Sequence, residues 1–384
     1  MTENVIKLYE QGKWKKWVIP VIVAATIITC IQLILGSSNN FTIFRYSSLH
    51  LISHQPLYLA YPGKYDDYFL YHPSFTVLFM PFAFLPLPVA LCLWTCLSMF
   101  VFLRAVYLLP GITDAAKKMM LLLALPEFIN NLQYAQTNIF LASLMLLAFI
   151  YFERGLLAGA AFFAVMAFCI KGYGGIAGLL FILYPGKLKF MGYAFLWGIL
   201  IAALPLLFVS FNEIIILYTD WLKMISSDGI KEGMSIIGLF GKTQQAELLI
   251  TITGFLLLFI SFVITLKRSA AGTFYFRGLL CCYLFLWVVL FNRAAESPTY
   301  QLAITGIAYW FALDGLKRRN VFIITILFLY VYLLPSDLFP AIFHQFFRQY
   351  QLKVYPFLLL FFYLQYQLLA TVKNVDPKRT SFQF

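Results

Sequence analysis

The sequence has 384 residues, of which 62% are hydrophobic and only 11% are charged. A soluble domain is nearer half apolar and a quarter charged, so this composition excludes a protein whose main solvent is water. The formal net charge of +12 does not indicate a nucleic-acid partner, because the basic residues stand in twos and threes between apolar runs, as membrane anchors do. We expect a single integral membrane domain over residues 1–384, with membrane lipids as its surroundings.

The first predicted element is the apolar run from Trp17 to Leu35. It is too long for a cleavable signal peptide and has no small-residue cleavage site, so it predicts a membrane span. Division of the chain at its polar clusters predicts an all-α, polytopic protein of about 12 transmembrane helices. The predicted spans are 17–36, 86–109, 119–130, 138–152, 156–170, 174–184, 190–210, 248–266, 278–291, 300–313, 320–334 and 353–372.

The charges between these spans predict the orientation. With the N-terminus in the cytoplasm, every inner connection carries Lys or Arg, and most of the 28 basic residues fall inside. This arrangement puts both termini in the cytoplasm and indicates a cell membrane, plasma or inner. Five of the six outer connections are distinctly polar, so function is expected on the outer face. They are 37–85, 130–138, 171–174, 211–247 and 292–300.

The first outer connection is the longest before residue 200, and part of it is predicted to be helical. Apolar residues recur at helical spacing between Phe41 and Leu59, which predicts interfacial helices in this loop. Its tyrosines are typical of an interfacial belt, but the adjacent Asp66 and Asp67 are not, because two neighbouring carboxylates beside a membrane require solvent, cations or a function. Both are candidate catalytic residues.

Lys171 lies between two apolar segments and is the strongest candidate for an anion ligand. An ammonium at membrane depth is unfavourable by about 2.5–3.5 kcal/mol and usually serves an ion, a partner or a substrate. The alternative is a lysine that extends to the outer interface. The glycines that follow it favour a phosphate site, because they allow backbone amides to approach an anion.

Two further outer turns carry polar side chains. Glu296 is a candidate general base or hydroxyl ligand, although an ion pair with Arg293 is the plainer interpretation. The turn from Asn130 to Asn138 is rich in amides, which recognise sugar hydroxyls but also satisfy helix ends. The histidines of the first loop lack the spacing of a metal site, and no metal or cofactor is predicted.

Several short motifs in chain order resemble glycosyltransferase family 87. They include Asn40-Phe41-x-Ile43-Phe44-x-Tyr46, Phe69-x-Tyr71-x-Pro73-x-Phe75, Gln136-Thr137-Asn138, Lys171-Gly172-Tyr173, Ser235-Ile236-x-Gly238-Leu239 and Ser297-Pro298. The resemblance implies the GT-C membrane fold and transfer of a sugar, with mannose as the candidate, from a polyprenyl-phosphate donor to a lipid or glycan acceptor. An acidic base and inversion at the anomeric carbon are also implied.

At Asn40 the chain departs from the family pattern, because the usual residue there is Asp and an amide is no general base at ordinary pH. The predicted catalytic residues are therefore Asp67, Glu296 and Asp66. The predicted donor-binding or substrate-binding residues are Asn40, Arg45, Tyr71, His72, Gln136, Asn138, Lys171, Tyr173 and Arg293. All are expected in one aqueous outer vestibule.

Two other functions compete with a transferase. A transporter or flippase for a lipid-linked saccharide would show internal repeats and charged groups on a path to both faces, neither of which is evident. A non-catalytic membrane protein derived from a transferase is the second alternative, and the amide at Asn40 supports it.

Overall fold

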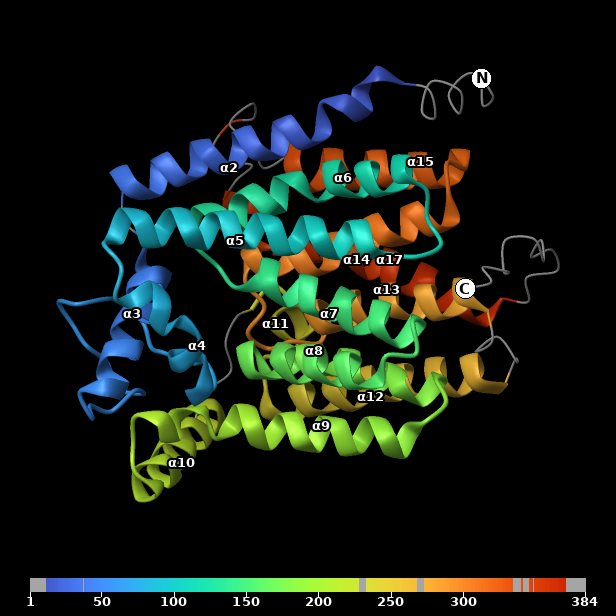
Figure 1. The fold of residues 1–384 in the computed structure, drawn as a ribbon. Helices are drawn as coiled ribbons and strands as arrows, with labels where there is room; N and C mark the ends of the chain where they lie inside the picture. Colours follow the sequence, from blue (N-terminus) through green and yellow to red (C-terminus); the bar gives the residue numbers. More distant parts are fainter. Residues whose placement is uncertain are drawn as a thin grey trace. The chain divides into compact units, whose positions relative to one another are not determined.

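The computed structural model describes residues 12–36, 38–227, 233–267, 273–333, 340, 345–347 and 349–370. These residues form helices and connecting turns without a strand, as the sequence predicts. Contacts group the chain into two compact units (Figure 1). One unit comprises Ile19–Leu108 and Glu127–Gly229, and the other comprises Met1–Val18, Leu109–Pro126 and Ile230–Phe384. The terminal residues 1–11 and 371–384, predicted to be cytoplasmic, lie outside the described residues.

The unit built from Ile19–Leu108 and Glu127–Gly229 contains most of the predicted outer loops. Its helices in chain order are α2 (Val18–Leu35), α3 (Asn39–Ile52), α4 (Pro73–Ala83), α5 (Leu87–Leu108), α7 (Asn138–Glu153), α8 (Leu157–Ile170), the 3-10 helix η2 (Gly172–Leu183), α9 (Lys187–Ala202), the 3-10 helix η3 (Leu204–Leu207) and α10 (Phe211–Ser227). The long helices α2, α5, α7, α8 and α9 run side by side, and α3, α4 and α10 gather at one end of them (Figure 1).

The other unit contains a second set of apolar helices. They are η1 (Lys13–Lys16), α11 (Ile236–Phe240), α12 (Gln244–Lys267), α13 (Phe274–Leu290), η5 (Ser297–Thr299), α14 (Tyr300–Asp314), α15 (Arg318–Phe328), the π-helix η6 (Leu329–Leu333) and α17 (Val354–Leu369). Helix α6 (Asp114–Gln133) begins in this unit and ends in the first one. The core lies on α13, where every side chain from Gly278 to Leu290 is buried. Tyr283 of α13 stacks on Phe361 of α17 with 4.5 Å between ring centroids.

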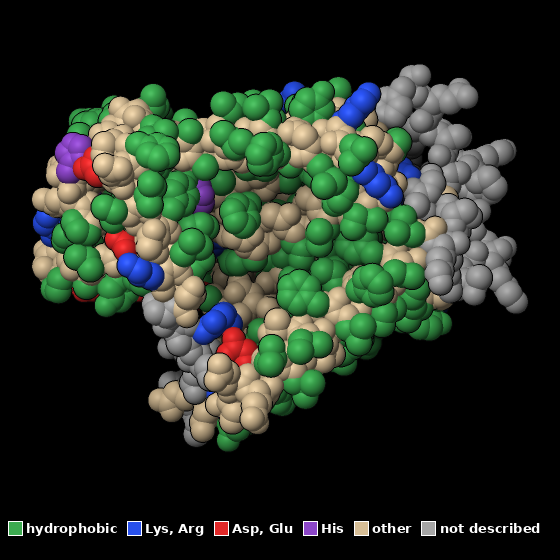
Figure 2. Space-filling model, turned by 90° about the horizontal axis from the view of Figure 1, so that it is seen from below, with side chains coloured by type: hydrophobic (Ala, Val, Ile, Leu, Met, Phe, Trp, Pro, Cys, Tyr) green, Lys and Arg blue, Asp and Glu red, His purple; other side chains and the backbone are tan. Residues whose placement is uncertain are grey.

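Each predicted span coincides with a helix or a run of consecutive helical segments. Among the described residues, four segments are long and apolar enough to cross a membrane: Val18–Leu35, Leu87–Leu108, Lys187–Leu207 and Gln244–Leu266. The others are shorter, so the count of twelve crossings stays a prediction. Hydrophobic side chains also cover most of the face drawn in Figure 2, as expected for a surface that meets lipid. A multi-pass membrane protein follows.

Hydroxyl side chains in the apolar helices donate hydrogen bonds to backbone carbonyls of the same helix. Thr26 donates to the carbonyl of Ile22 at 2.9 Å, and Ser143 donates to that of Ile139 at 2.7 Å. In lipid an unpaired hydroxyl has no water to bond, so this local bond removes its desolvation penalty. These serines and threonines therefore fit the spans without indicating a polar site.

The first outer loop begins with a helix, although it ends earlier than predicted. Ser38 caps α3 by accepting the Phe41 amide at 3.4 Å, and the helix ends at Ile52 rather than near Leu59. Its apolar face packs on α4, where the rings of Phe44 and Phe75 lie edge to face at 5.1 Å. This contact holds α3 against α4. The predicted position of α3 in the membrane interface is not tested by the structure.

Candidate active site

Lys171 is held at the junction of α8 and η2 by a neighbour from the predicted amide-rich turn. Its ammonium donates to Asn138 Oδ1 at 2.9 Å and lies 5.9 Å from the ring centroid of Tyr71. The side chain is half-buried. Since α7 begins at Asn138 and α8 ends at Ile170, the packing of these two antiparallel helices brings the amide and the ammonium together.

A buried chain of amides continues from Asn138. Its Nδ2 donates to Asn131 Oδ1 at 3.1 Å, and Asn131 Nδ2 donates to the backbone carbonyl of Glu127 at 2.9 Å. Asn131 is fully buried and Asn138 nearly so. Because both ends of each amide are engaged, Asn138 presents its oxygen to Lys171 in a fixed orientation.

Glu127 is a buried polar residue that the sequence analysis did not select. It is 1% exposed, and its Oε2 accepts Asn130 Nδ2 at 3.2 Å. The signal was a carboxylate inside an apolar run, which in a membrane segment is by itself grounds for a functional hypothesis. It was overlooked because it falls near the end of the predicted span 119–130.

The first loop is joined to the same turn by three hydrogen bonds. Tyr71 and Thr137 share a hydroxyl–hydroxyl contact at 3.2 Å, and Asn40 Nδ2 donates to the Tyr134 carbonyl at 2.9 Å. Ser38 Oγ donates to that same carbonyl at 3.4 Å. The Asn40 amide therefore anchors α3 to the turn that holds Lys171.

Asp66 and Asp67 lie in an exposed turn that the neighbouring Asn39 holds. Asn39 Nδ2 donates to the Asp66 carbonyl at 2.5 Å, and the Asp66 amide donates to Asn39 Oδ1 at 2.9 Å. Asp67 has a φ of +78°, and its Oδ1 accepts the Tyr68 amide at 2.8 Å. Both carboxylates remain open to solvent. The turn is thus fixed by its backbone while its side chains are exposed.

The other predicted binding residues of this unit have varied surroundings. His72 is buried, caps α4 by accepting the Ser74 amide at 3.3 Å, and meets Trp221 with 4.8 Å between ring centroids. Burial lowers its pKa to about 4, so it is neutral at physiological pH. Arg45 is half-buried on α3 and has no ion partner among the described residues. Gln136 is buried, and its Oε1 finds no hydrogen-bond partner in the described part of the chain. Tyr173 is half-buried at the start of η2.

The glycines after Lys171 serve packing. A Cβ on Gly174 would lie 2.3 Å from Leu141 Cδ1 and 2.7 Å from the Ala167 carbonyl oxygen. Gly174 therefore allows η2 to approach α7 and α8. The 3-10 helix begins directly after Lys171 without a side-chain cap, so the positive end of its dipole follows the Lys171 backbone.

The turn that carries Glu296 belongs to the other unit. Glu296 is exposed and stands at the N-cap of η5, where its amide donates to Thr299 Oγ1 at 3.0 Å. The ion pair that the structure shows for Arg293 is with Glu247, at 3.5 Å, so the predicted pair with Glu296 is not formed among the described residues. Lys353, which sequence reasoning also missed, is buried and donates to Ser297 Oγ at 3.2 Å.

His50, which the sequence did not single out as a catalytic or binding residue, lies among aromatic side chains of the first loop. Its ring lies 4.0 Å from that of Tyr61, and neither ring nitrogen finds a hydrogen-bond partner in the described segments. Burial, with a smaller effect of Lys64, lowers its pKa to about 4. His54 by contrast is exposed and bonds Glu213 Oε1 at 2.7 Å. Across the described residues, no three His, Cys, Asp or Glu side chains gather as metal ligands.

The family model for glycosyltransferase family 87 matches residues 69–292, more than half of the sequence. The chain belongs to glycosyltransferase family 87. A membrane glycosyltransferase is thereby indicated, and the expected resemblance is confirmed. No curated protein matches the chain. Among solved structures, it is similar to ArnT from Cupriavidus metallidurans bound to undecaprenyl phosphate, at 18% identity and a TM-score of 0.41, over 95% of this chain and 74% of that one.

The family 87 match divides the predicted residues into two sets. Within it lie Tyr71, His72, Gln136, Asn138, Lys171 and Tyr173. The three candidate carboxylates and Asn40 lie outside the matched range. Family membership by itself assigns no role to any of these residues.

Proposed function

We propose that this family 87 glycosyltransferase moves a sugar, with mannose as the candidate, from a polyprenyl-phosphate donor to a hydroxyl of a lipid or glycan acceptor on the outer face of the membrane. The observation that carries the proposal is Lys171, an ammonium oriented by a buried amide at 2.9 Å at the end of an apolar helix. A cation at this depth usually serves an ion, a partner or a substrate, and the donor class implied by the family motifs has a phosphate that an ammonium can bind.

The phosphate is expected to bind between Lys171 and the start of η2. The ammonium offers charge-assisted hydrogen bonds, and the uncapped positive end of the 3-10 helix adds to its field. Because Asn138 fixes the ammonium before the donor arrives, little reorganisation is needed when negative charge develops on the leaving phosphate. Arg45, without an ion partner in the described part of the chain, is the second candidate cation.

The sugar is expected to lie against the amide-rich turn. Gln136 Oε1 is an acceptor with no partner in the described chain, so a sugar hydroxyl that donates to it would satisfy it. Tyr71 stacks on Phe75 at 4.7 Å and presents the rest of its ring toward Lys171, as a wall for the apolar face of a sugar. These groups supply orientation, which the displacement requires.

We assign the general base to the carboxylate turn of the first loop, with Asp67 as the first candidate. The carboxylate takes the proton of the acceptor hydroxyl, and the acceptor oxygen attacks the anomeric carbon. The bond from that carbon to the phosphate oxygen breaks, and the phosphate leaves with the electron pair toward Lys171. A direct displacement inverts the anomeric configuration. Asp66 and Glu296 are the other candidates.

The experiment is a transfer assay with polyprenyl-phosphate mannose in proteoliposomes. Lys171→Met keeps the length of the side chain but removes its charge, and should lower transfer about 10²- to 10³-fold, the usual effect of removing one group that stabilises a developing oxyanion. Asp67→Asn should abolish most of the transfer while donor binding persists. Lys223→Met, at an exposed site on α10, is the matched control and should retain activity.

The result also separates the competing functions. If the wild-type protein transfers no sugar but moves the intact donor between leaflets, a flippase is indicated and the proposal is wrong. If it binds donor and neither transfers nor moves it, a non-catalytic relative is indicated. Full transfer by Asp67→Asn would reassign the base to Asp66 or Glu296.

A further inference from the structure

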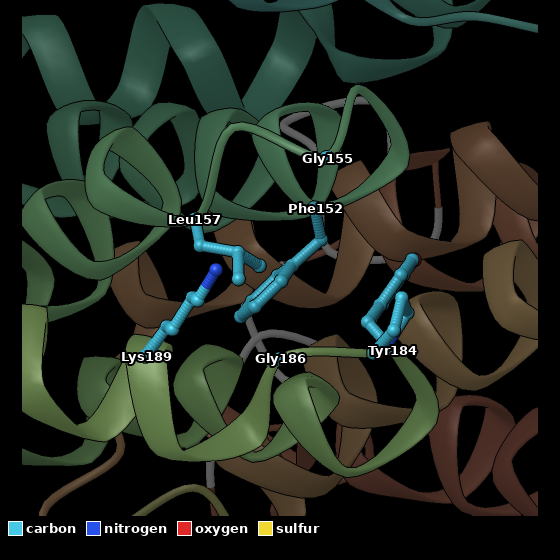
Figure 3. Close-up of a pocket in the computed structure, with 7 residues that line it drawn as sticks. Phe152, Gly155, Leu157, Tyr184, Gly186 and Lys189 are labelled. Carbon is cyan, nitrogen blue, oxygen red and sulfur yellow. The ribbon is translucent and has the colours of Figure 1, made fainter.

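A cavity of about 300 Å³ opens at the end of the α7–α8 pair that lies away from Lys171. The turn between the two helices and the turn before α9 form it, with Phe152, Leu157, Tyr184 and Lys189 in its lining. Figure 3 shows Lys189 extending from α9 toward Leu157 beside the ring of Phe152. The lining is mostly apolar carbon with one ammonium, which suits an amphiphilic anion.

The cavity and the candidate active site lie at opposite ends of the same helices. The 16 residues of α7 run from Asn138 at the site to Glu153 at the cavity, and α8 returns from Leu157 to Ile170. A helix of that length spans roughly 24 Å, close to the thickness of the hydrocarbon core. The predicted crossing of α7 puts the cavity at the level of the opposite leaflet, one helix length from the transfer site.

The walls of the cavity are built from stacked rings. Phe152 and Tyr184 stack with 5.0 Å between centroids and 12° between planes, and Phe190 packs on Phe152 at 5.0 Å. The hydroxyl of Tyr184 donates to Glu153, which is the acidic side chain beside this end. The Glu153 carboxylate is thus engaged, while Lys189 remains exposed at the opening.

Helix α9, which borders the opening of the cavity, has a surface that faces lipid. It belongs to the membrane-length segment Lys187–Leu207, and only 17% of the apolar window in that segment is buried inside the protein. Leu188 is 83% exposed between Lys187 and Lys189. Lysines that flank such a segment lie at the level of the lipid head groups. With Arg154 in the adjacent turn, the two turns at this end carry three basic residues and one acidic residue in sequence.

We propose that this cavity binds one anionic glycerophospholipid of the leaflet opposite the transfer site. The phosphate pairs with Lys189, and the upper part of an acyl chain lies against Phe152 and Leu157. A zwitterionic lipid has the same chain and phosphate but also a cation, which the cluster of basic side chains disfavours. The assignment does not depend on the donor or on the chemistry of transfer.

Native mass spectrometry of the detergent-solubilised protein, titrated with phosphatidylglycerol, tests this site. Lys189→Gln should weaken the phosphatidylglycerol adduct about tenfold, the effect of losing one charge-assisted hydrogen bond. Leu157→Trp, which fills the cavity, should weaken it at least as much. Lys187→Gln is the matched control, because it removes an equal charge from the same helix end without lining the cavity, and it should change binding by no more than about twofold.

Three results would overturn the assignment. Equal losses in Lys187→Gln and Lys189→Gln would indicate unspecific attraction to surface charge. Unchanged phosphatidylglycerol binding by Lys189→Gln, with unchanged thermal unfolding, would show that Lys189 does not bind the lipid phosphate. Phosphatidylcholine binding as tight as that of phosphatidylglycerol would show that the negative charge is not recognised.

Discussion

The contact between Lys171 and Asn138 allows the charge of the site to be changed without removing a side chain. Asn138→Asp places a carboxylate oxygen where the amide oxygen now accepts the ammonium at 2.9 Å. The lysine then has a permanent counter-ion, and a donor phosphate must share it. A carboxylate and a phosphate on one ammonium lie about 5 Å apart and repel by about 3 kcal/mol at an effective dielectric of 20. Because Lys171 is half-buried, solvent reduces this repulsion, and we expect the donor KM to rise about 10- to 100-fold.

The same substitution has a predictable effect on stability. It removes the N–H that Asn138 donates to Asn131 Oδ1 at 3.1 Å and leaves two buried acceptors facing each other. An unsatisfied buried acceptor costs about 1–3 kcal/mol, and the new ion pair with Lys171 offsets part of it. The variant should therefore fold, with a modestly lower unfolding temperature in detergent.

The assay is steady-state transfer at varied donor concentration for the wild type, Asn138→Asp, Lys171→Met and the double variant. If both residues act through one phosphate site, the effects of Asn138→Asp and Lys171→Met on the donor KM should not be additive in the double variant. Gln133→Glu adds a charge to the same turn at an exposed position and is the control. An unchanged KM in a folded Asn138→Asp protein would refute the assignment of Lys171 to the phosphate.

Three further outcomes follow from individual contacts. Gly174→Ala forces a methyl to 2.3 Å from a leucine of α7 and should destabilise the protein by about 1–3 kcal/mol, whereas Gly198→Ala, with open space around its Cβ, should be neutral or slightly stabilising in thermal unfolding. Burial lowers the pKa of His50 to about 4, so between pH 6.5 and pH 4 the unfolded chain binds a proton that the folded protein does not. The free energy of unfolding should therefore be constant above pH 6.5 as far as His50 is concerned and fall between pH 6.5 and pH 4. His50→Phe should reduce that fall when unfolding is measured across this range. Asn39→Ala frees the turn of Asp66 and should lower kcat about tenfold with little change in donor KM, as measured in the transfer assay.

The helices were predictable because lipid leaves the backbone few choices. An apolar run without charges must pair its own amides and carbonyls, so its helical structure could be predicted from composition alone. The ends of the helices were less predictable. The helical pattern of the first loop extended to Leu59, but α3 ends at Ile52, because Ser53 and the left-handed His54 begin a turn that the apolar spacing does not encode.

The site was predictable in its residue types and less so in its contacts. Lys171 and Asn138 stood out because polar groups are rare in apolar segments. Their bond could not be inferred, because it depends on how α7 and α8 are aligned. The ion partner of Arg293 could not be inferred for the same reason: Glu296, for which a pair with Arg293 was one of two interpretations, caps a 3-10 helix, and Glu247 reaches the arginine from α12. Short-range spacing finds helix caps, whereas pairs distant in sequence require the packed structure.

The amide at Asn40 separates two tasks that an acid at this position would combine. Its Nδ2 donates to the Tyr134 carbonyl, a bond that a carboxylate cannot make because it has no proton to give. An acid here would face that carbonyl with a second acceptor and loosen α3 from the turn that orients Lys171. The adjacent Asn39 meanwhile holds the exposed turn of Asp66 and Asp67, because its side chain bonds both the amide and the carbonyl of Asp66. We therefore expect the acid of the first loop to act from the exposed turn, where the acceptor hydroxyl can reach it from solvent.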